Sequence, residues 1–418
     1  MALGKSDNDT ASPRRHRNRF PGPRVASVAM PTPYQGSILS PSLLVAPWHA
    51  LLVALLVATA GCGVDRTGAV VATGSSTSGP TTSTTSTTST AASERGSTST
   101  TAPGAGGEPV TIAFGGDVHF DSILGQTLVH DPGAVLAGVK PLFEAADLAV
   151  VNLETAIGSG GAKVTKAFNF RAPPTAFDAL AAAGVDVVAM ANNHALDYGQ
   201  AGLQETLAAV AERHAPVIGI GQDEDEAYRP FTTTIKGQRI AVIAATQIID
   251  GNLITDWTAT PSHPGVASAK REARLVTAVT AARRDADTVI VFLHWGTETK
   301  TCPNAAQLAL APQLVAAGAD VIVGGHAHRV LGGGYLDGAF VDYGLGNLQF
   351  VASSPEGRET GILDVTVRGR HVDHARWIPA HIGSGDQPVL LTGAAADAAQ
   401  ARWQSKRACT KLSDEPTR

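Results

Sequence analysis

The chain has 418 residues, which is long enough for one large domain or two ordinary ones. It is 44% hydrophobic and 17% charged, a composition that allows a packed core and excludes a wholly disordered or collagen-like chain. The 32 Lys and Arg residues against 37 Asp and Glu residues give a formal net charge of −5, so no basic excess points to nucleic acid. Three cysteines are too few for a disulfide framework or a cysteine-rich zinc site.

Residues 1–62 predict an export segment. A polar, Pro-rich and basic stretch over residues 1–40 is followed by an apolar run over residues 50–60 that ends at Gly61-Cys62. The run is too short to span a bilayer, which takes about 20 residues. A basic stretch, a short apolar core and small residues, in this order, are typical of a secretory signal. We therefore expect export across the cytoplasmic membrane.

Cys62 adds a second expectation about location. Ala60-Gly61-Cys62 resembles a bacterial lipobox, whose cysteine is lipidated after cleavage. A lipid on Cys62 would anchor the chain at the outer face of the membrane, as a lipoprotein. A plain signal peptide and an anchor helix that begins at Leu43 remain as alternatives, and the true start is either Met1 or Met30.

The segment 63–108 is predicted to be a disordered linker. Between Thr73 and Thr101, 21 of 29 residues are Ser or Thr. Such a segment has almost nothing apolar to bury, so it cannot offset the entropy that it would lose on ordering. A tether of this kind would hold a folded domain away from the membrane.

Residues 109–385 are predicted to form one α/β domain. Six apolar runs have the length and composition of buried strands, at residues 110–114, 148–151, 185–190, 240–244, 288–293 and 320–323. Helix-compatible stretches lie at residues 174–183, 199–213, 267–284 and 305–317. Strands separated by helices favour a layered α/β fold in which helices cover the faces of a sheet.

The helical patterns stop after residue 337. Residues 340–343, 361–368 and 371–377 have the pattern of successive strands, which predicts a second and more antiparallel sheet. Residues 386–418 are assigned to a C-terminal extension.

Polar motifs follow five of the apolar strands. They are Gly115-Gly116-Asp117-Val118-His119, Asn152-Leu153-Glu154, Asn192-Asn193-His194 with Asp197, His294-Trp295-Gly296, and His326-Ala327-His328. Polar side chains at this position emerge at the sheet rim, where α/β proteins bind ligands. Each motif alone has a simpler explanation; the Asn193 motif, for example, can cap the helix that begins near Gly199. Together they place Asp, Glu, Asn and His at one sheet rim, which two divalent cations would explain.

The mixture of ligand types narrows the choice of metal. Imidazole nitrogens beside carboxylate oxygens suit Zn, Mn or Fe better than Ca. Two such cations about 3.5–4 Å apart would hold a bridging hydroxide and clamp a scissile group. Metal binding lowers the pKa of water from 15.7 toward roughly 7, so a nucleophile exists at neutral pH.

Taken in order, the motifs resemble those of the CapA family of poly-γ-glutamate capsule synthesis proteins. The resemblance covers about residues 110–380 and rests on the five motifs above, on Glu298 in the fourth, and on Leu345-Gly346-Asn347. That family looks like a branch of the calcineurin-like metallophosphoesterases. The resemblance therefore implies a four-layer αββα sandwich with two mixed β-sheets and two metals at the sheet rim.

The resemblance also implies roles for individual residues. Seven residues correspond to metal ligands: Asp117, His119, Glu154, Asn193, His294, His326 and His328. Glu154 stands where the superfamily has a metal-bridging Asp, and His194 is expected near the leaving group as a general acid. Asp197 either orients His194 or caps the following helix. Arg329 flanks the site, where it either meets an anionic substrate or is a solvated surface residue.

Cys302 and Cys409 are left once Cys62 is assigned to lipid. In an oxidising compartment two cysteines outside the motifs can pair, and the alternative is two buried thiols. The closed loop would span about 107 residues, for which the chain-entropy model gives roughly 4–5 kcal/mol of stabilisation.

Two classes of function stay open. The first is an exported di-metal hydrolase of capsule or envelope polymer metabolism, which cleaves a phosphoester or amide bond in the polymer or in an anionic small molecule. The second is a non-catalytic surface component that binds or anchors capsule polymer, with capsule-synthesis proteins as partners. The complete ligand set favours the hydrolase, because a polymer binder has no need of His194 beside a metal pair. Nucleic acid is not expected as a partner.

Overall fold

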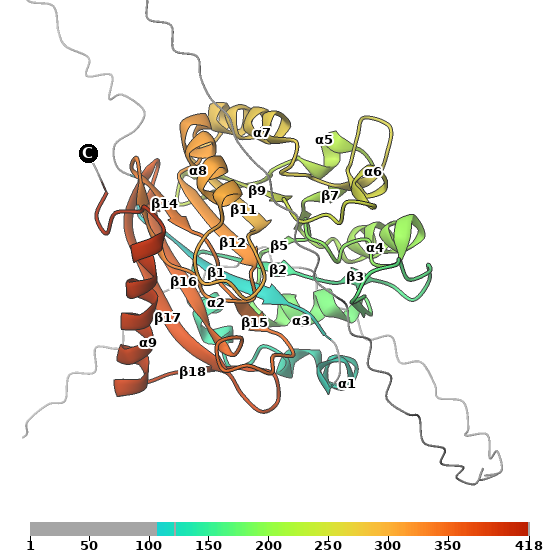
Figure 1. Ribbon diagram of the computed structural model, residues 1–418, viewed down its shortest axis with the longest axis horizontal. Coiled ribbons are helices and arrows are strands. Elements are labelled where there is room, and N and C mark those ends of the chain that lie inside the picture. The colour runs from blue at the N-terminus through green and yellow to red at the C-terminus, as the bar shows by residue number, and fades with distance from the viewer. Residues whose placement is uncertain (1–106, 121–122, 417–418) are drawn as a thin grey trace, which may run out of the picture. The chain divides into compact units, whose positions relative to one another are not determined.

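A computed structural model of the protein describes residues 107–120 and 123–416. The expected export segment, Cys62 and most of the expected linker lie outside the described residues. Within the described part, the chain has a mixed α/β structure with two large mixed sheets and two small two-stranded ones (Figure 1).

The larger sheet has eight strands. In pairing order they are β18 (Pro388–Leu390), β17 (His371–Ile382), β16 (Glu359–Arg368), β1 (Val110–Val118), β2 (Leu148–Leu153), β5 (Val187–Ala189) and β6 (Val217–Ile218), with β15 (Asn347–Gln349) paired to β1. The strands β15, β1, β2, β5 and β6 pair in parallel, whereas β16, β17 and β18 pair antiparallel. The parallel part therefore brings the carboxyl ends of β1, β2 and β5 to one edge.

The second large sheet has six strands. In pairing order they are β13 (Gly333–Leu336), β14 (Ala339–Asp342), β12 (Val321–His326), β11 (Thr288–Trp295), β9 (Gln238–Thr246) and β8 (Phe231–Ile235). Its four central strands are parallel, and β8 and β13 are antiparallel edges. The two small sheets pair β3 (Ala156–Ile157) with β4 (Arg171–Ala172), and β7 (Ile220–Gly221) with β10 (Gly265–Val266).

The apolar runs in the sequence arise because the central strands are buried on both faces. In β9, Val242 belongs to a hydrophobic cluster that it shares with Phe114 of β1 in the other sheet. Ile243, the next residue, belongs instead to a cluster with Leu275 and Leu310, which lie on two helices. Successive side chains of a strand point to opposite faces, so burial of both faces removes the usual apolar–polar alternation.

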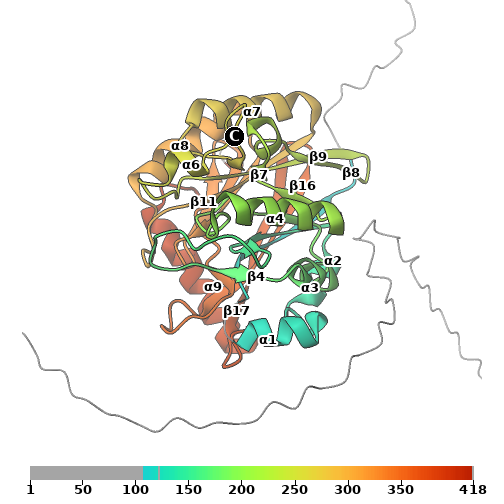
Figure 2. The same ribbon diagram turned by 90° about the vertical axis from the view of Figure 1, so that its right-hand side faces the viewer.

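Helices cover the outer faces of these strands. They are α1 (Ile123–His130), α2 (Lys140–Ala145), α3 (Thr175–Ala183), α4 (Gly199–Arg213), α5 (Glu224–Ala227), α6 (Ile254–Trp257), α7 (Glu272–Asp285), α8 (Ala305–Ala317) and α9 (Gly393–Lys406), with 3-10 turns at Pro132–Ala134 and Arg407–Cys409. Figure 2 looks onto α4, with α7 above it and α1 below it. Leu128, Phe177 and Leu203 from α1, α3 and α4 pack in one cluster with Val151 of β2. In the described part of the chain, every helix is too short or too polar to cross a membrane.

The structure corrects three expectations about the elements. The predicted helix at 267–284 begins only at Glu272, because Ala267 and Ser268 pair with neighbouring backbone at Gly219 and Thr246. The later strands do not form a sheet of their own, since β14 joins the six-stranded sheet while β16 and β17 join the eight-stranded one. The C-terminal segment also contains a helix, α9, that was not anticipated.

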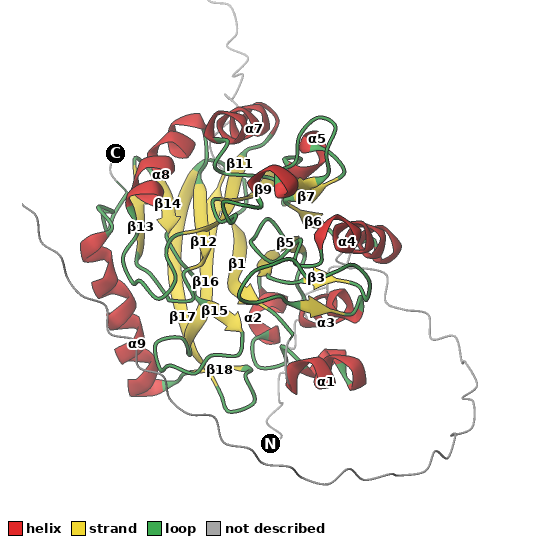
Figure 3. Cartoon of the chain, turned by 45° about the vertical axis from the view of Figure 1, so that its right-hand side comes forward, coloured by secondary structure: helices red, strands yellow, loops and turns green. Residues whose placement is uncertain are grey.

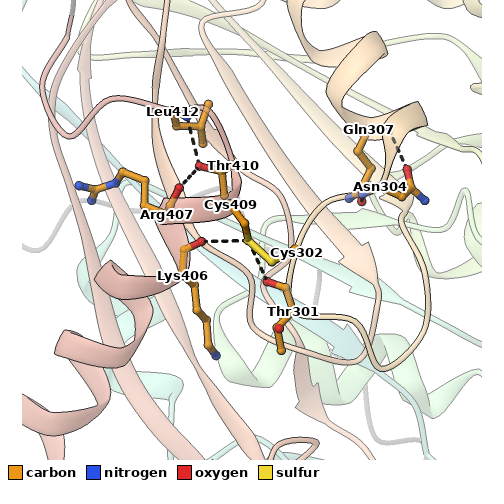
Figure 4. Close-up of a disulfide and its surroundings, with 9 residues drawn as sticks. All are labelled: Thr301, Cys302, Asn304, Gln307, Lys406, Arg407, Cys409, Thr410 and Leu412. Atoms are coloured by element: carbon orange, nitrogen blue, oxygen red, sulfur yellow. Dashed lines mark hydrogen bonds between the residues drawn. A yellow bond between two sulfur atoms is a disulfide. The ribbon is translucent and has the colours of Figure 1, made fainter.

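The C-terminal segment packs on the same described unit. Strand β18 extends the eight-stranded sheet, and Trp403 of α9 stacks on Trp377 of β17 with ring centroids 6.2 Å apart. Cys409, just beyond α9, forms a disulfide with Cys302, as Figure 4 shows. The cysteine pairing expected from the sequence is therefore confirmed.

Candidate metal centre

Most of the predicted ligands come together where the strand ends of the two large sheets meet. Asp117 lies near the end of β1 and Glu154 directly follows β2, both in the eight-stranded sheet, whereas His294 and His326 lie near the ends of β11 and β12 in the six-stranded sheet. The strands β1 and β12 contact each other although they belong to different sheets (Figure 3). The expectation of a single sheet rim was therefore wrong, because two rims form the site.

Asp117 is fully buried and forms hydrogen bonds with strands of both large sheets. Its Oδ1 accepts a hydrogen bond from Asn152 Nδ2 at 2.8 Å, and its Oδ2 accepts one from the backbone N–H of His326 at 2.8 Å. Its oxygens also lie 3.9 Å from His294 Nδ1 and 3.5 Å from His328 Nδ1. Both distances are short enough for these residues to share one site.

Glu154 is the least satisfied polar residue of the site. It is fully buried, and neither carboxylate oxygen has a hydrogen-bond partner among the residues that the structure describes. The nearest imidazole nitrogens, on His194, His294 and His328, lie 3.5–3.8 Å from Oε1, which is beyond normal hydrogen-bond length. Burial, followed by the charge of Asp117, raises the pKa of Glu154 well above its usual value. A cation beside this carboxylate would remove the cost of burying it.

His294 is held in one orientation by two amides. Its Nε2 lies 2.7 Å from Asn193 Oδ1, and its Nδ1 lies 3.2 Å from Asn152 Nδ2. Burial lowers the pKa of His294 to about 3, so the ring is neutral at pH 7. A neutral imidazole is the form that binds metal ions.

His326 and His328 both adopt left-handed backbone conformations. Their φ angles are 84° and 49°. Residues other than glycine rarely adopt this backbone conformation, which costs of order 1–3 kcal/mol. The turn directs both imidazoles toward the strand ends, with ring centroids 5.9 Å apart. His326 Nδ1 is buried without a partner in the described chain. Strain of this kind concentrates at functional sites.

The pKa values of the two histidines in the His-x-His motif shift in opposite directions. Burial lowers the pKa of His326 well below its usual value, with His294 and His328 adding to the shift. Burial acts in the same direction on His328, but the nearby Glu154 and Asp117 outweigh it and raise the pKa of His328. His328 Nδ1 also lies 2.8 Å from Asn347 Oδ1, which fixes the ring.

His119 lies at the aromatic side of the site. Its ring packs against Phe170 and Phe350 at centroid distances of 4.5 and 3.9 Å, and its Nε2 accepts a hydrogen bond from the Val351 backbone N–H at 3.1 Å. Its Nδ1 is buried and has no partner among the described residues. Burial lowers the pKa of His119 to about 3, so the ring is neutral at pH 7. While Nε2 accepts from Val351, the ring proton is on Nδ1, so His119 can bind a cation only after this hydrogen bond is given up or the tautomer changes.

His194 stands beside Glu154. Its Nδ1 lies 2.6 Å from Asp197 Oδ2, and its Nε2 points toward Glu154 at 3.8 Å. Burial lowers the pKa of His194 to about 4, although Asp197 acts against the shift. Asp197 therefore orients His194. It does not cap the helix, because α4 has no side-chain cap at its amino end.

Some residues of the site were missed in the sequence. Asn152 belongs to one of the polar motifs without a predicted role, and its side-chain amide bridges Asp117 to His294. Lys166 and Phe170 lie in the segment between β3 and β4. This segment has neither helical nor strand periodicity in the sequence, and neither residue follows an apolar strand run. A lysine without helical or strand context has no signal that separates it from a surface lysine.

The residues present fit divalent metal ions. Three groups place ligand atoms within 4.8 Å of one another: Glu154, His294 and His326; Asp117, Glu154 and His328; and Glu298, His326 and His328. Glu154 and His326, which have unpartnered buried atoms, belong to these groups, whereas His119 belongs to none of them. Imidazole and carboxylate donors in this mixture suit transition metals. Glu298, which the sequence offers only as part of the fourth motif, is thus a further candidate ligand.

The fold and the site define a mixed α/β protein with a candidate metal centre between two sheets. The chain belongs to the family described as bacterial capsule synthesis protein PGA_cap, whose family model matches residues 111–352. This match confirms the CapA-type resemblance read from the motifs.

Several curated proteins are similar to the chain. The PGA biosynthesis protein CapA of Bacillus subtilis (strain 168) is 27% identical over 61% of this chain and 67% of its own length. The capsule biosynthesis protein CapA of Bacillus anthracis is 28% identical over 56% of each chain. The probable polyglutamine synthesis accessory protein Rv0574c of Mycobacterium tuberculosis is 31% identical over 44% of this chain and 50% of its own length. The chain thus spans between half and two thirds of these relatives.

Two solved structures align with part of the chain, with low TM-scores and low sequence identity. A hypothetical protein from Thermus thermophilus aligns with a TM-score of 0.40 and 16% identity, over 64% of this chain and 98% of that one. A 5′-nucleotidase from Candida albicans aligns with a TM-score of 0.38 and 10% identity, over 71% of this chain and 58% of that one. Both scores are too low to transfer a fold or an activity.

Proposed function

We propose that the chain is a metal-dependent hydrolase of capsule or envelope polymer metabolism, acting on a phosphoester or amide bond. The observation that carries this proposal is Glu154, a fully buried carboxylate with two unpartnered oxygens and three imidazoles around it. A buried charge without a partner is costly, and a metal site is the simplest arrangement that would remove the cost. The relatives named for capsule and PGA biosynthesis supply the polymer context.

The residues that would hold two divalent cations are the seven predicted ligands, with Glu298 added. They are Asp117, His119, Glu154, Asn193, His294, His326, His328 and Glu298. The donor set suits Mn, Zn or Fe. When bound, such ions supply Lewis-acid activation of water and of the scissile group.

His194 supplies the proton transfer in this proposal. Because Asp197 accepts from Nδ1–H and the pKa of His194 is about 4, Nε2 carries a lone pair at neutral pH. Nε2 takes a proton from the attacking water and gives it to the leaving oxygen or nitrogen, as one bond forms at the scissile centre and the other breaks. Such proton transfer contributes about 10²–10⁴-fold to a rate.

We propose the four-layer αββα arrangement for the fold. Strands of both large sheets share one hydrophobic cluster, and two further clusters join each sheet to its own helices. Superposition of an experimental structure on a metallophosphoesterase would test this arrangement, and a different order of layers would contradict it.

We also propose a location at the outer face of the cytoplasmic membrane, through a lipid on Cys62. The proposal rests on the basic stretch, the short apolar run and Ala60-Gly61-Cys62 in the sequence. Capsule-synthesis proteins at the same surface are the expected partners. A Cys62→Ser chain that stays membrane-bound and unprocessed to the same degree as the wild type would exclude the lipid anchor.

Metal analysis and turnover test the hydrolase proposal together. The purified protein is expected to contain divalent metal and to hydrolyse p-nitrophenyl phosphate or an amide substrate until a chelator removes the metal. His326→Ala should lower metal content, whereas His194→Ala should retain metal and lose about 10²–10⁴-fold in turnover. His374→Ala, an exposed histidine on β17, serves as the control and should change neither property.

A non-catalytic polymer-binding component is the second candidate. One relative is named as an accessory protein of synthesis, which favours this alternative. Bound metal without turnover on any phosphoester or amide, together with binding of poly-γ-glutamate, would support it over the hydrolase.

A further inference from the structure

Lys166 is buried beside the site although lysine is usually exposed. Its side chain is 7% exposed, and its ammonium group lies 5.3 Å from the centroid of the Trp257 ring. Nζ donates to Asp197 Oδ1 at 2.8 Å and also to the backbone oxygen of Asn193. A buried ammonium group with this set of partners is committed to Asp197 and is not a free surface charge.

Asp197 receives three donors on a fully buried carboxylate. Lys166 occupies Oδ1, while His194 Nδ1 and the backbone N–H of Phe170 both bind Oδ2, at 2.6 and 2.5 Å. Lys166 is the one Lys or Arg side chain in the described chain that forms an ion pair with Asp197. Because Oδ1 is taken by Lys166, the carboxylate plane is fixed with Oδ2 facing His194.

The Asp197 carboxylate positions two neighbours of the His194 ring, its own Oδ2 and the Phe170 ring. Phe170, whose amide binds Asp197, stacks on His194 with a centroid distance of 4.1 Å and an interplanar angle of 25°. The backbone oxygen of Asp197 accepts further hydrogen bonds from Val164 N and Asn169 Nδ2. One edge and one face of the imidazole are therefore positioned by groups that all converge on Asp197.

We propose that Lys166 is a positioning residue for His194, acting through Asp197 and the Phe170 segment. The proposal rests on the proposed hydrolase function for its effect on turnover. Lys166 Nζ lies 3.4 Å from His194 Nδ1, on the side of the ring away from the reacting Nε2, and its shorter contact is with the Asp197 carboxylate at 2.8 Å. It holds the carboxylate that keeps Nε2 of His194 directed at the space beside Glu154. Loss of such an outer partner typically costs about 10–100-fold in activity.

Lys166→Met in the full chain tests the proposal, with Lys163→Met as a matched control. Lys163 lies three residues away in the same segment and is exposed. The first readout is the low-field proton resonance of the His194 ring N–H bound to Asp197, assigned by its loss in His194→Ala. We expect it to be present in the wild type and in Lys163→Met, and to be shifted or lost in Lys166→Met. An unchanged resonance in Lys166→Met overturns the proposal.

The second readout separates positioning from general loss of structure. A misplaced proton donor matters most for a poor leaving group, so Lys166→Met should lose about 10–100-fold in kcat on phenyl phosphate and much less on p-nitrophenyl phosphate. KM and metal content should stay near wild-type values. Equal losses on both esters would indicate a structural role and would contradict the proposal.

A second variant at position 166 covers the case in which Lys166→Met does not fold. Lys166→Gln retains a polar side chain, so it replaces Lys166→Met if an apolar group at this buried position prevents folding. If the wild-type protein hydrolyses neither ester, the proposed function fails on phosphoesters, and the His194 resonance alone then decides the role of Lys166.

Discussion

Gly325 leaves room for the carboxylate of Asp117. A Cβ atom on residue 325 would lie 2.3 Å from Asp117 Oδ1 and 3.4 Å from His294 Nδ1. The first distance is far below van der Waals contact, and the carboxylate is fixed by hydrogen bonds from Asn152 and His326. The absence of a side chain between β1 and β12 is therefore a condition for the site.

Gly325→Ala is expected to weaken metal binding by about 10–100-fold, the range typical of changes at residues that do not bind the metal themselves but orient its ligands. The added methyl group must push Asp117 away from its present position. Titration of the metal-free protein with Mn²⁺ or Zn²⁺ measures the effect. Gly385→Ala is the control, because residue 385 is exposed and its Cβ would meet no atom within 4 Å. Equal affinities in the two variants would contradict this role of Gly325.

Some residues of the site can be predicted from the sequence, and others cannot. Asp117, Glu154 and His326 were found because each follows or ends a strongly apolar strand, and strand ends gather at a rim. Lys166 and Phe170 were not found, because their contact with Asp197 is made by a segment without periodic structure. The left-handed turn at His326 also has no sequence signal, since a positive φ is uncommon for any residue other than glycine.

At the scale of elements, strands and long helices were predicted well, but their assignment to sheets was not. The helices at 199–213 and 305–317 match α4 and α8 in their bounds, and α8 has the signals expected at both ends: Asn304 forms a capping box and Gly318 is left-handed. An apolar run shows that a strand is buried on both faces, but it carries no information about its partner strand. This is why the division of β1 and β12 between two sheets, which creates the site, required the structure.

Helix α9 is attached to β16 through one carboxylate. Glu359 binds Lys406 Nζ at 2.5 Å and Arg402 Nε at 2.9 Å. Burial opposes the ionisation of Glu359, but the hydrogen bonds and charges of Lys406 and Arg402 outweigh it and lower the pKa of Glu359. Because the folded-state pKa lies below the unfolded value, the contribution to stability is present above the unfolded pKa and is lost as pH falls through the folded one.

Glu359→Gln is expected to reduce the free energy of unfolding by about 1–2 kcal/mol at pH 7. The value stays below that of a fully buried pair because Arg402 is 56% exposed. The difference from wild type should shrink as the pH is lowered below about 4.5, the ordinary pKa of the group. Urea unfolding across pH measures this, and Asp397→Asn on the exposed face of α9 is the control. A difference independent of pH would show that the ion pair is not its cause.

At the scale of the whole molecule, the disulfide links the C-terminal segment to the loop beside the candidate metal centre. Cys302 lies in the segment after β11 that also carries Glu298, and Thr299 of this segment donates its N–H to the Ala327 oxygen at 2.9 Å. Ala327 lies between the two histidines of the His-x-His motif. The bond therefore closes a long loop of the fold and also restrains a segment with a candidate ligand.

Replacement of both cysteines by serine is expected to lower the free energy of unfolding by up to roughly 4–5 kcal/mol. The two residues are 107 positions apart in the sequence, and a cross-link over such a loop removes conformational freedom from the unfolded chain. Chemical unfolding of Cys302→Ser/Cys409→Ser with and without reductant measures the effect. Reductant should bring the wild type to the stability of the double variant and should leave the variant unchanged. If the wild type is equally stable with and without reductant, and both thiols are free to react after denaturation, the link does not form in solution and the C-terminal segment is held by α9 and β18 alone.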